Sequence, residues 1–86
     1  MKLKIFSVFD SKAEAFLPPF FAGTKGQAIR SFSDAVQDSG HAFSKHCSDY
    51  TLFELGLFDD SDANIIMLPT PVSLGIAIEF INKEDL

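Results

Sequence analysis

The first residues alternate in the manner of a β-strand. From Lys2 to Phe9, the residues Leu3, Ile5, Ser7 and Phe9 share one face, and the even-numbered residues share the other. Both faces carry apolar side chains, which favours a strand that is well covered by the rest of the protein. Residues 10–23 include Pro18-Pro19 and Gly23, so this segment is predicted to be a structured loop with a short extended piece at 15–17.

A helix is expected from Thr24. Thr24 stands three residues before Gln27, the spacing of a capping box in which the threonine hydroxyl accepts the Gln27 N–H and the Gln27 side chain returns to Thr24. Helical spacing then places one set of residues inward (Ala28, Ile29, Phe32, Ala35, Val36) and another outward (Arg30, Ser31, Asp34, Gln37). The segment Asp38-Ser39-Gly40 ends the helix, with Gly40 as a left-handed terminator.

Gly26 in the first turn has two interpretations. A close approach of Phe20 or Phe21 is the favoured reason for a glycine there. The alternative is an open helix start whose backbone N–H groups meet a phosphate.

Residues 50–58 are predicted to form a second strand, with Thr51, Phe53, Leu55 and Leu57 on one face. The polar turn 59–64 leads to a short antiparallel strand at 65–68. Thr70-Pro71 then matches a helix start, and the apolar residues after it favour a second helix; a further strand over 72–81 is the alternative, because those residues also alternate.

These elements predict an α+β fold, a small antiparallel sheet of about three strands packed by one central helix, with a short C-terminal helix. At 86 residues the chain has room for a single core, so residues 1–86 are expected to form one domain. The lone Cys47 excludes an internal disulfide, and no apolar stretch is long enough to span a bilayer. We therefore expect a protein of the cytoplasm without membrane contact.

Charge is distributed unevenly along the sequence. Up to His46 there are six basic and four acidic residues, whereas from Cys47 onward there is one basic residue against eight acidic ones, for a net charge of −5. We expect a bipolar molecule. This asymmetry is compatible with a basic surface in the N-terminal half, although head-to-tail packing of identical chains or simple solubility explains it better.

Catalytic and metal chemistry is not favoured. His41, His46, Cys47 and Asp49 are metal-ligand types, but neighbouring positions point apart and a polar loop is the better interpretation. Asp59, Asp60, Asp62 and Asn64 resemble the start of a calcium loop but lack its glycine and its bidentate glutamate, so a solvated turn is favoured. No base partner is evident for Cys47. We expect no enzyme activity, no cofactor and no metal.

Nucleic acid binding needs a cationic track with exposed aromatic rings. The strand face with Lys2, Lys4 and Phe6 is the one place where such a track could form. The candidate nucleic-acid-binding residues are Lys2, Lys4, Lys12, Lys25, Arg30 and Lys45.

Several segments together also match a known family. They are Met1-Lys2-Leu3-Lys4-Ile5, Pro18-Pro19-Phe20-Phe21, Gly26-Gln27-Ala28-Ile29-Arg30, Lys45-His46, Asp49-Tyr50, and 52–60 with Leu52-Phe53 and Phe58-Asp59-Asp60. In these the chain resembles the small nonstructural protein of gokushovirus-type microviruses, bacteriophages with a single-stranded DNA genome. Cys47-Ser48 departs from the Pro-Glu usual there.

The resemblance implies a nonstructural, DNA-associated protein in the host cytoplasm that assists synthesis of single-stranded viral genomes or their coupling to packaging. Its partner would be single-stranded or replicating viral DNA. The alternative is a non-enzymatic adaptor for the phage replication initiator or a host replication factor. An open sheet edge and the many phenylalanines also predict a homodimer or higher homo-oligomer, paired edge to edge or face to face.

Overall fold

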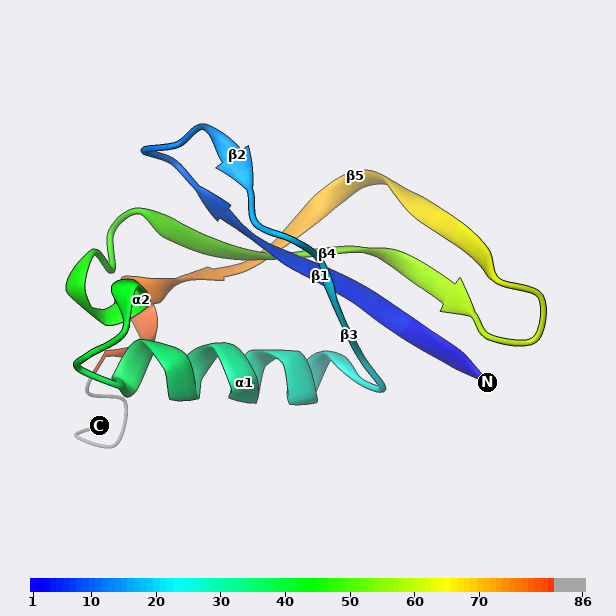
Figure 1. Cartoon of the computed structure of the whole chain (residues 1–86), viewed down its shortest axis with the longest axis horizontal. Coiled ribbons are helices and arrows are strands. Elements are labelled where there is room, and N and C mark those ends of the chain that lie inside the picture. The colour runs from blue at the N-terminus through cyan, green and yellow to red at the C-terminus, as the bar shows by residue number, and fades with distance from the viewer. Residues whose placement is uncertain (82–86) are drawn as a thin grey trace.

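The computed structural model describes residues 1–81, and Figure 1 shows one helix lying along one side of a twisted antiparallel sheet. The strands are β1 (Lys2–Asp10), β2 (Ala15–Phe16), β3 (Phe20–Ala22), β4 (Tyr50–Asp59) and β5 (Asn64–Ile76). The helices are α1 (Lys25–Gln37), the one-turn α2 (Ala42–Lys45) and the 3₁₀ turn η1 (Ala77–Phe80). No helix within residues 1–81 combines the length and apolar character needed to cross a membrane.

Strand β1 lies in the middle of the sheet because it accepts partners on both edges. On one edge it pairs with β4 over its whole length, and β4 pairs in turn with β5. On the other edge it pairs with β2 near Phe9 and with β3 near Ile5. The diproline between β2 and β3 has no N–H to donate, which explains the interruption of pairing there.

A buried serine holds that interrupted edge in place. The Ser7 hydroxyl donates a hydrogen bond to the Leu17 carbonyl, and the Leu17 N–H donates to the Val8 carbonyl at 2.8 Å. Ser7 is therefore satisfied although it is only 1% exposed.

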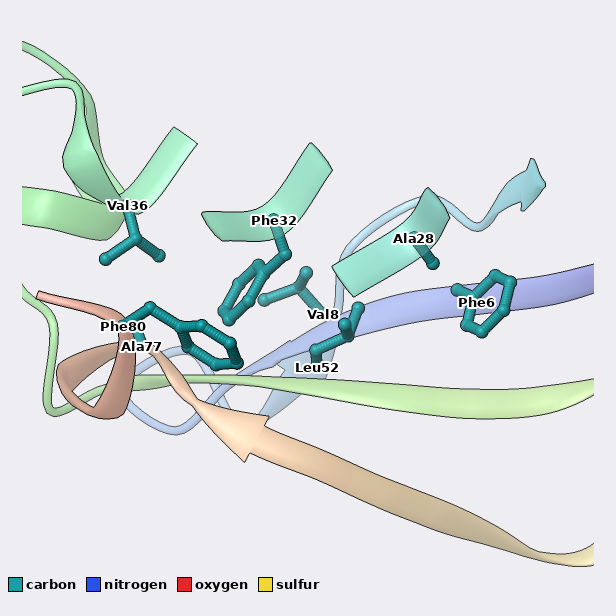
Figure 2. Close-up of a cluster of buried hydrophobic side chains, with 8 residues drawn as sticks. All are labelled: Phe6, Val8, Ala28, Phe32, Val36, Leu52, Ala77 and Phe80. Carbon is teal, nitrogen blue, oxygen red and sulfur yellow. The ribbon is translucent and has the colours of Figure 1, made fainter. Parts of the chain in front are cut away.

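The core fills the space between α1 and one face of the sheet (Figure 2). Helix residues Ala28, Phe32 and Val36 point toward the sheet, as the helical spacing predicts. The eight buried members of the core come from four elements, β1, α1, β4 and η1: Phe6, Val8, Ala28, Phe32, Val36, Leu52, Ala77 and Phe80. Ile5 is also buried but lies outside this cluster, on the opposite face of β1.

An extra residue in β4 changes which residues of this strand face the helix. Along β1, Phe6 pairs with Glu54 and the adjacent Ile5 pairs with Gly56, so Leu55 is the extra residue in β4. Opposite it, β5 bulges outward between Met67 and Val72. A Cβ on Gly56 would lie 2.3 Å from the Ile66 carbonyl oxygen, so the bulge requires a glycine there.

The bulge corrects the predicted face assignment of β4. Leu57 pairs with Lys4 on the helix side, and Phe58 pairs with Leu3 on the other side. Strict alternation from Thr51 to Leu57 is therefore wrong, because one inserted residue reverses every position after it.

The start and end of α1 differ in detail from the prediction. The Gln27 N–H donates to the Thr24 hydroxyl at 3.1 Å, as expected. The Gln27 side chain, however, accepts from the Gly23 N–H at 3.0 Å and not from Thr24. Gly40 has no left-handed backbone; instead the Asp38 carboxylate accepts its N–H at 3.0 Å after the helix has ended.

The C-terminal region departs most from the prediction. Residues 72–76 are strand, because the free edge of β4 offers backbone partners: Val72 pairs with Glu54 and Ser73 with Phe53. Gly75 at φ +142 lets the Phe80 ring approach within 2.9 Å of where a Cβ would stand. The expected C-terminal helix is reduced to the 3₁₀ turn 77–80, while 82–86 lie outside the described residues.

The α+β class and the antiparallel strands predicted at 2–9 and 50–58 are confirmed, whereas the short strand predicted at 65–68 is only part of the longer β5. The strand count of about three is too low, because β2 and β3 add two short pieces to one edge and make the sheet five-stranded. Helix α2 was also missed; the His41 ring caps it by accepting the Phe43 N–H at 3.1 Å.

Candidate functional site

The basic start of β1 lies beside the acidic end of β4. Antiparallel pairing places Lys2 opposite Asp59. The Lys4 ammonium lies 3.3 Å from a Glu54 carboxylate oxygen, and that Glu54 side chain is only 16% exposed. The amino terminus of Met1 lies 2.9 Å from an Asp60 oxygen. The cations of this end are therefore matched by carboxylates, and the expected separation of charge into two halves of the molecule is wrong here.

Two pKa values are shifted at this end of the molecule. The hydrogen bond to Asp60, followed by its charge, raises the pKa of the Met1 amino group. Hydrogen bonds from the Ser61 hydroxyl and the Ser61 N–H lower the pKa of Asp59. Both groups are exposed, so solvent screens these interactions strongly.

The face with Lys2, Lys4 and Phe6 offers no ring for base stacking. Phe6 is 0% exposed because α1 covers it and the Phe20 ring stacks on it, with ring centres 5.7 Å apart. A base could reach the flanking lysines but not this ring.

The first half of α1 differs from this end. Lys25 and Arg30 are both exposed, and the first turn holds no acidic residue. Neither cation has a carboxylate within 4.0 Å among residues 1–81. Arg30 also lines a shallow hollow of about 310 Å³ together with Thr24, Gly26 and Gln27.

Gly26 is open at this hollow. A Cβ there would meet only the Thr24 hydroxyl at 3.9 Å, so close packing of Phe20 or Phe21 does not explain the glycine. The favoured explanation from the sequence is therefore wrong, and the open helix start, with its partial positive charge, is the one that fits the geometry.

The remaining two candidates belong to the turn after β1 and to α2, and these segments lie at the end of the molecule opposite the amino terminus (Figure 1). Lys12 is in the turn after β1, where it lines a hollow with Asp10, His46, Asp49 and Tyr50. Lys45 ends the short helix α2 and is exposed. The structure thus distributes the six predicted residues over three places and does not form one basic surface.

The candidate metal ligands are used within the protein's own turns. His41 caps α2, and Cys47 packs against the core. Asp59 accepts from Ser61 and Asp62 from Asn64, as in ordinary polar turns. Within residues 1–81 no three histidine, cysteine or acidic side chains gather closely enough to hold a metal.

One surface was missed by sequence reasoning: the face of the sheet opposite α1. We call it the open face; it consists of Leu3, Ile5, Ser7, Phe9, Phe16, Phe21, Phe53, Phe58, Ile65 and Met67. These residues alternate with the core positions of β1 or pair with residues that do. The apolar character of Leu3, Ile5 and Phe9 is a usable signal in the sequence, but it fits a strand covered on both sides equally well.

A comparison with known families identifies the chain. The model of the family described as Phage ORF5 protein matches residues 3–80. The chain belongs to this family. It is thus a bacteriophage protein, and the match includes nearly all of the described structure, from β1 to η1. No curated protein and no solved structure matches the chain.

Proposed function

We propose that this member of the Phage ORF5 family is a non-enzymatic, DNA-associated protein that assists synthesis of single-stranded viral genomes in the host cytoplasm. The finer part of this proposal comes from the resemblance to the small nonstructural protein of gokushovirus-type microviruses. The structural observation that supports it most is the start of α1, where Lys25 and Arg30 are exposed and have no carboxylate partner within residues 1–81.

The geometry of this start suits a phosphate backbone. A phosphate near Gly26 would meet the positive end of the helix and the Arg30 guanidinium, with no acidic side chain in the first turn to repel it. Two cations give a weak, salt-sensitive interaction, since each phosphate contact releases about one counterion. The proposal therefore concerns accessory binding without base sequence preference.

Lys2 and Lys4 contribute less to DNA binding in this proposal. Their carboxylate neighbours Asp59 and Glu54 would repel phosphates as strongly as the lysines attract them. DNA contacts are therefore assigned to the first half of α1.

Charge reversal tests this assignment. Binding of a fluorescein-labelled 20-nucleotide single strand is measured by anisotropy at low salt for the wild type, for K25E/R30E and for K12E/K45E. The last variant is a matched control, because it changes the net charge equally at the other end of the molecule. We expect K25E/R30E to weaken binding by at least about 10-fold and the control to weaken it by less than about 3-fold.

A flat titration of the wild-type protein at low salt would remove the DNA proposal. Equal losses for the two variants would show that net charge alone, and not the start of α1, governs binding.

The second candidate function is the adaptor for the phage replication initiator or a host replication factor. The observation that favours it is the acidic turn between β4 and β5, which projects at one end of the molecule (Figure 1) and keeps Asp60 and Asp62 exposed. Capture from infected cells with tagged protein tests it. Recovery of a replication protein by the wild type and its loss from D60N/D62N supports the adaptor, whereas recovery of viral DNA alone counts against it.

A further inference from the structure

We propose that the open face packs against the open face of a second copy of this chain, so that two sheets lie together with an α1 helix on each outer side. This inference goes beyond the DNA-associated function and does not depend on it. It rests on the exposed apolar area of the face, on its lack of charge and on its internal order.

The open face leaves large apolar side chains in water. Phe16, Phe21, Ile65 and Met67 are 44%, 48%, 55% and 57% exposed. At roughly 150–250 Å² for a large side chain, these four expose on the order of 400 Å². The partly exposed members of the face, Leu3, Phe9, Phe53 and Phe58, add to this area.

That area meets the requirement of a specific dimer. Two open faces in contact remove on the order of 800 Å² through the four most exposed side chains, and the partly exposed ones bring the total to about the 1,000 Å² that a specific interface needs. An apolar patch of this size is also at the upper end for a protein that stays monomeric.

The face carries no charge. None of its ten members is ionisable, and the lysines of β1 project from the opposite side of the strand. Two chains of net charge −5 can therefore approach here without burying an ion or placing acidic groups in contact. A two-fold axis makes such a face its own complement, since apolar positions meet apolar positions.

The face is also ordered before any contact is made. The Phe16 ring packs edge-on against Phe9 and Phe53, with centres 5.0 and 5.5 Å apart, and Phe21 packs against Phe58 at 5.5 Å. Rings already held in this way lose little conformational entropy on association. Aligned packing of two twisted sheets at a spacing of about 10 Å is a common solution for such faces.

Nucleic acid does not suit the open face as well as a second copy does. Exposed rings can stack on bases, but a single strand also needs cations beside the rings. The candidate cations lie on the helix side of β1, on α1, on α2 and in the turn after β1. Phosphates next to this face would find no positive partner on it.

The test uses two neighbouring residues of β5 that point to opposite faces. Ile65 pairs with Phe58 on the open face, and Ile66 pairs with Leu57 on the helix side, where it is 51% exposed. I65D therefore places a charge in the proposed interface, and I66D is a control with the same chemistry, strand and exposure. M67D is a second variant on the open face.

Sedimentation equilibrium of the full chain between micromolar and high micromolar concentration gives the mass and the dissociation constant. We expect the wild type and I66D to approach twice the 9.5 kDa monomer mass. I65D and M67D should each weaken association by about 30-fold or more, because a charge placed among the apolar side chains of the interface has no partner there. Circular dichroism confirms that each variant is folded.

A monomeric wild type at high micromolar concentration would overturn the proposal. So would a dimer that I65D and M67D leave intact while I66D dissolves it, since that result places the contact on the other side of β5. If addition of single-stranded DNA at low salt dissociates the wild-type dimer, the open face binds nucleic acid and the assignment to a second copy is wrong.

Discussion

The two faces of the sheet are built from the same strands but have different environments. The face toward α1 is closed by three helix residues and by Phe80, so the Phe6 ring on this face and the Phe32 ring that covers it are almost fully buried. The open face carries as many rings, yet Phe16 and Phe21 remain about half exposed. One helix therefore covers one face only, and apolar content alone does not show which face is covered.

The largest expected difference between the faces concerns stability. F32A removes a ring from the centre of the covered face and should lower the free energy of unfolding by about 3–5 kcal/mol. F21A on the open face should cost only about 1 kcal/mol, because half of that ring is already in water. Urea unfolding of both variants at low protein concentration measures the gap. Equal costs would show that the open face is covered in solution even at that concentration.

The bulge at Gly56 decides which residues of β4 point to each face. G56A should destabilise the protein by about 1–3 kcal/mol, because its Cβ would lie 2.3 Å from the Ile66 carbonyl oxygen and the two strands must move apart. G26A is the matched control: its Cβ has open space, so it should stabilise α1 by about 0.5–1 kcal/mol. Thermal melts of the two variants should therefore shift in opposite directions, and a stabilising G56A would contradict the bulge.

The N-cap of α1 should stabilise the helix that covers the inner face of the sheet. T24A removes the hydroxyl that accepts the Gln27 N–H and should cost about 1 kcal/mol. Replacement by serine keeps the hydroxyl and should restore most of this loss. If T24A and T24S melt at the same temperature, the cap does not stabilise the helix.

The charged end of the molecule, where β1 begins, should make the stability of the protein weakly dependent on pH. The pKa of Asp59 is lowered, so its contribution to stability is present above the ordinary carboxyl pKa and is lost as pH falls through the folded value. The pKa of the Met1 amino group is raised, so its contribution is complete below its ordinary value and is lost as pH rises through the folded value.

Melting temperatures of the wild type, D59N and D60N, measured across pH, separate these two contributions. D59N should reduce the loss of stability at acid pH, and D60N should reduce the loss of stability at alkaline pH. If D60N loses as much stability as the wild type at alkaline pH, the Met1–Asp60 contact does not contribute in solution.

Local signals identified most of the secondary structure. The alternation of β1, the Thr24 cap and the inward helix residues depend on neighbours within a few positions, so each could be recognised from the sequence. The choice between helix and strand for residues 72–76 could not be made in this way, because the residues fit both patterns and the outcome depends on the free edge of β4, some twenty residues away. For the same reason β3 and the face change at Leu55 were missed.

The candidate site shows the same division. The sequence alone determined the α+β class, the position of the capped helix and the presence of an excess of cations before Cys47. Strand pairing in the folded protein places Lys2 and Lys4 beside Asp59 and Glu54, whereas Lys25 and Arg30 have no carboxylate partners among residues 1–81. The fold also leaves one apolar face of the sheet open. Ion pairing and burial depend on which distant segments pair with one another. The alternation of residues within one strand does not show which other strands will pair with it.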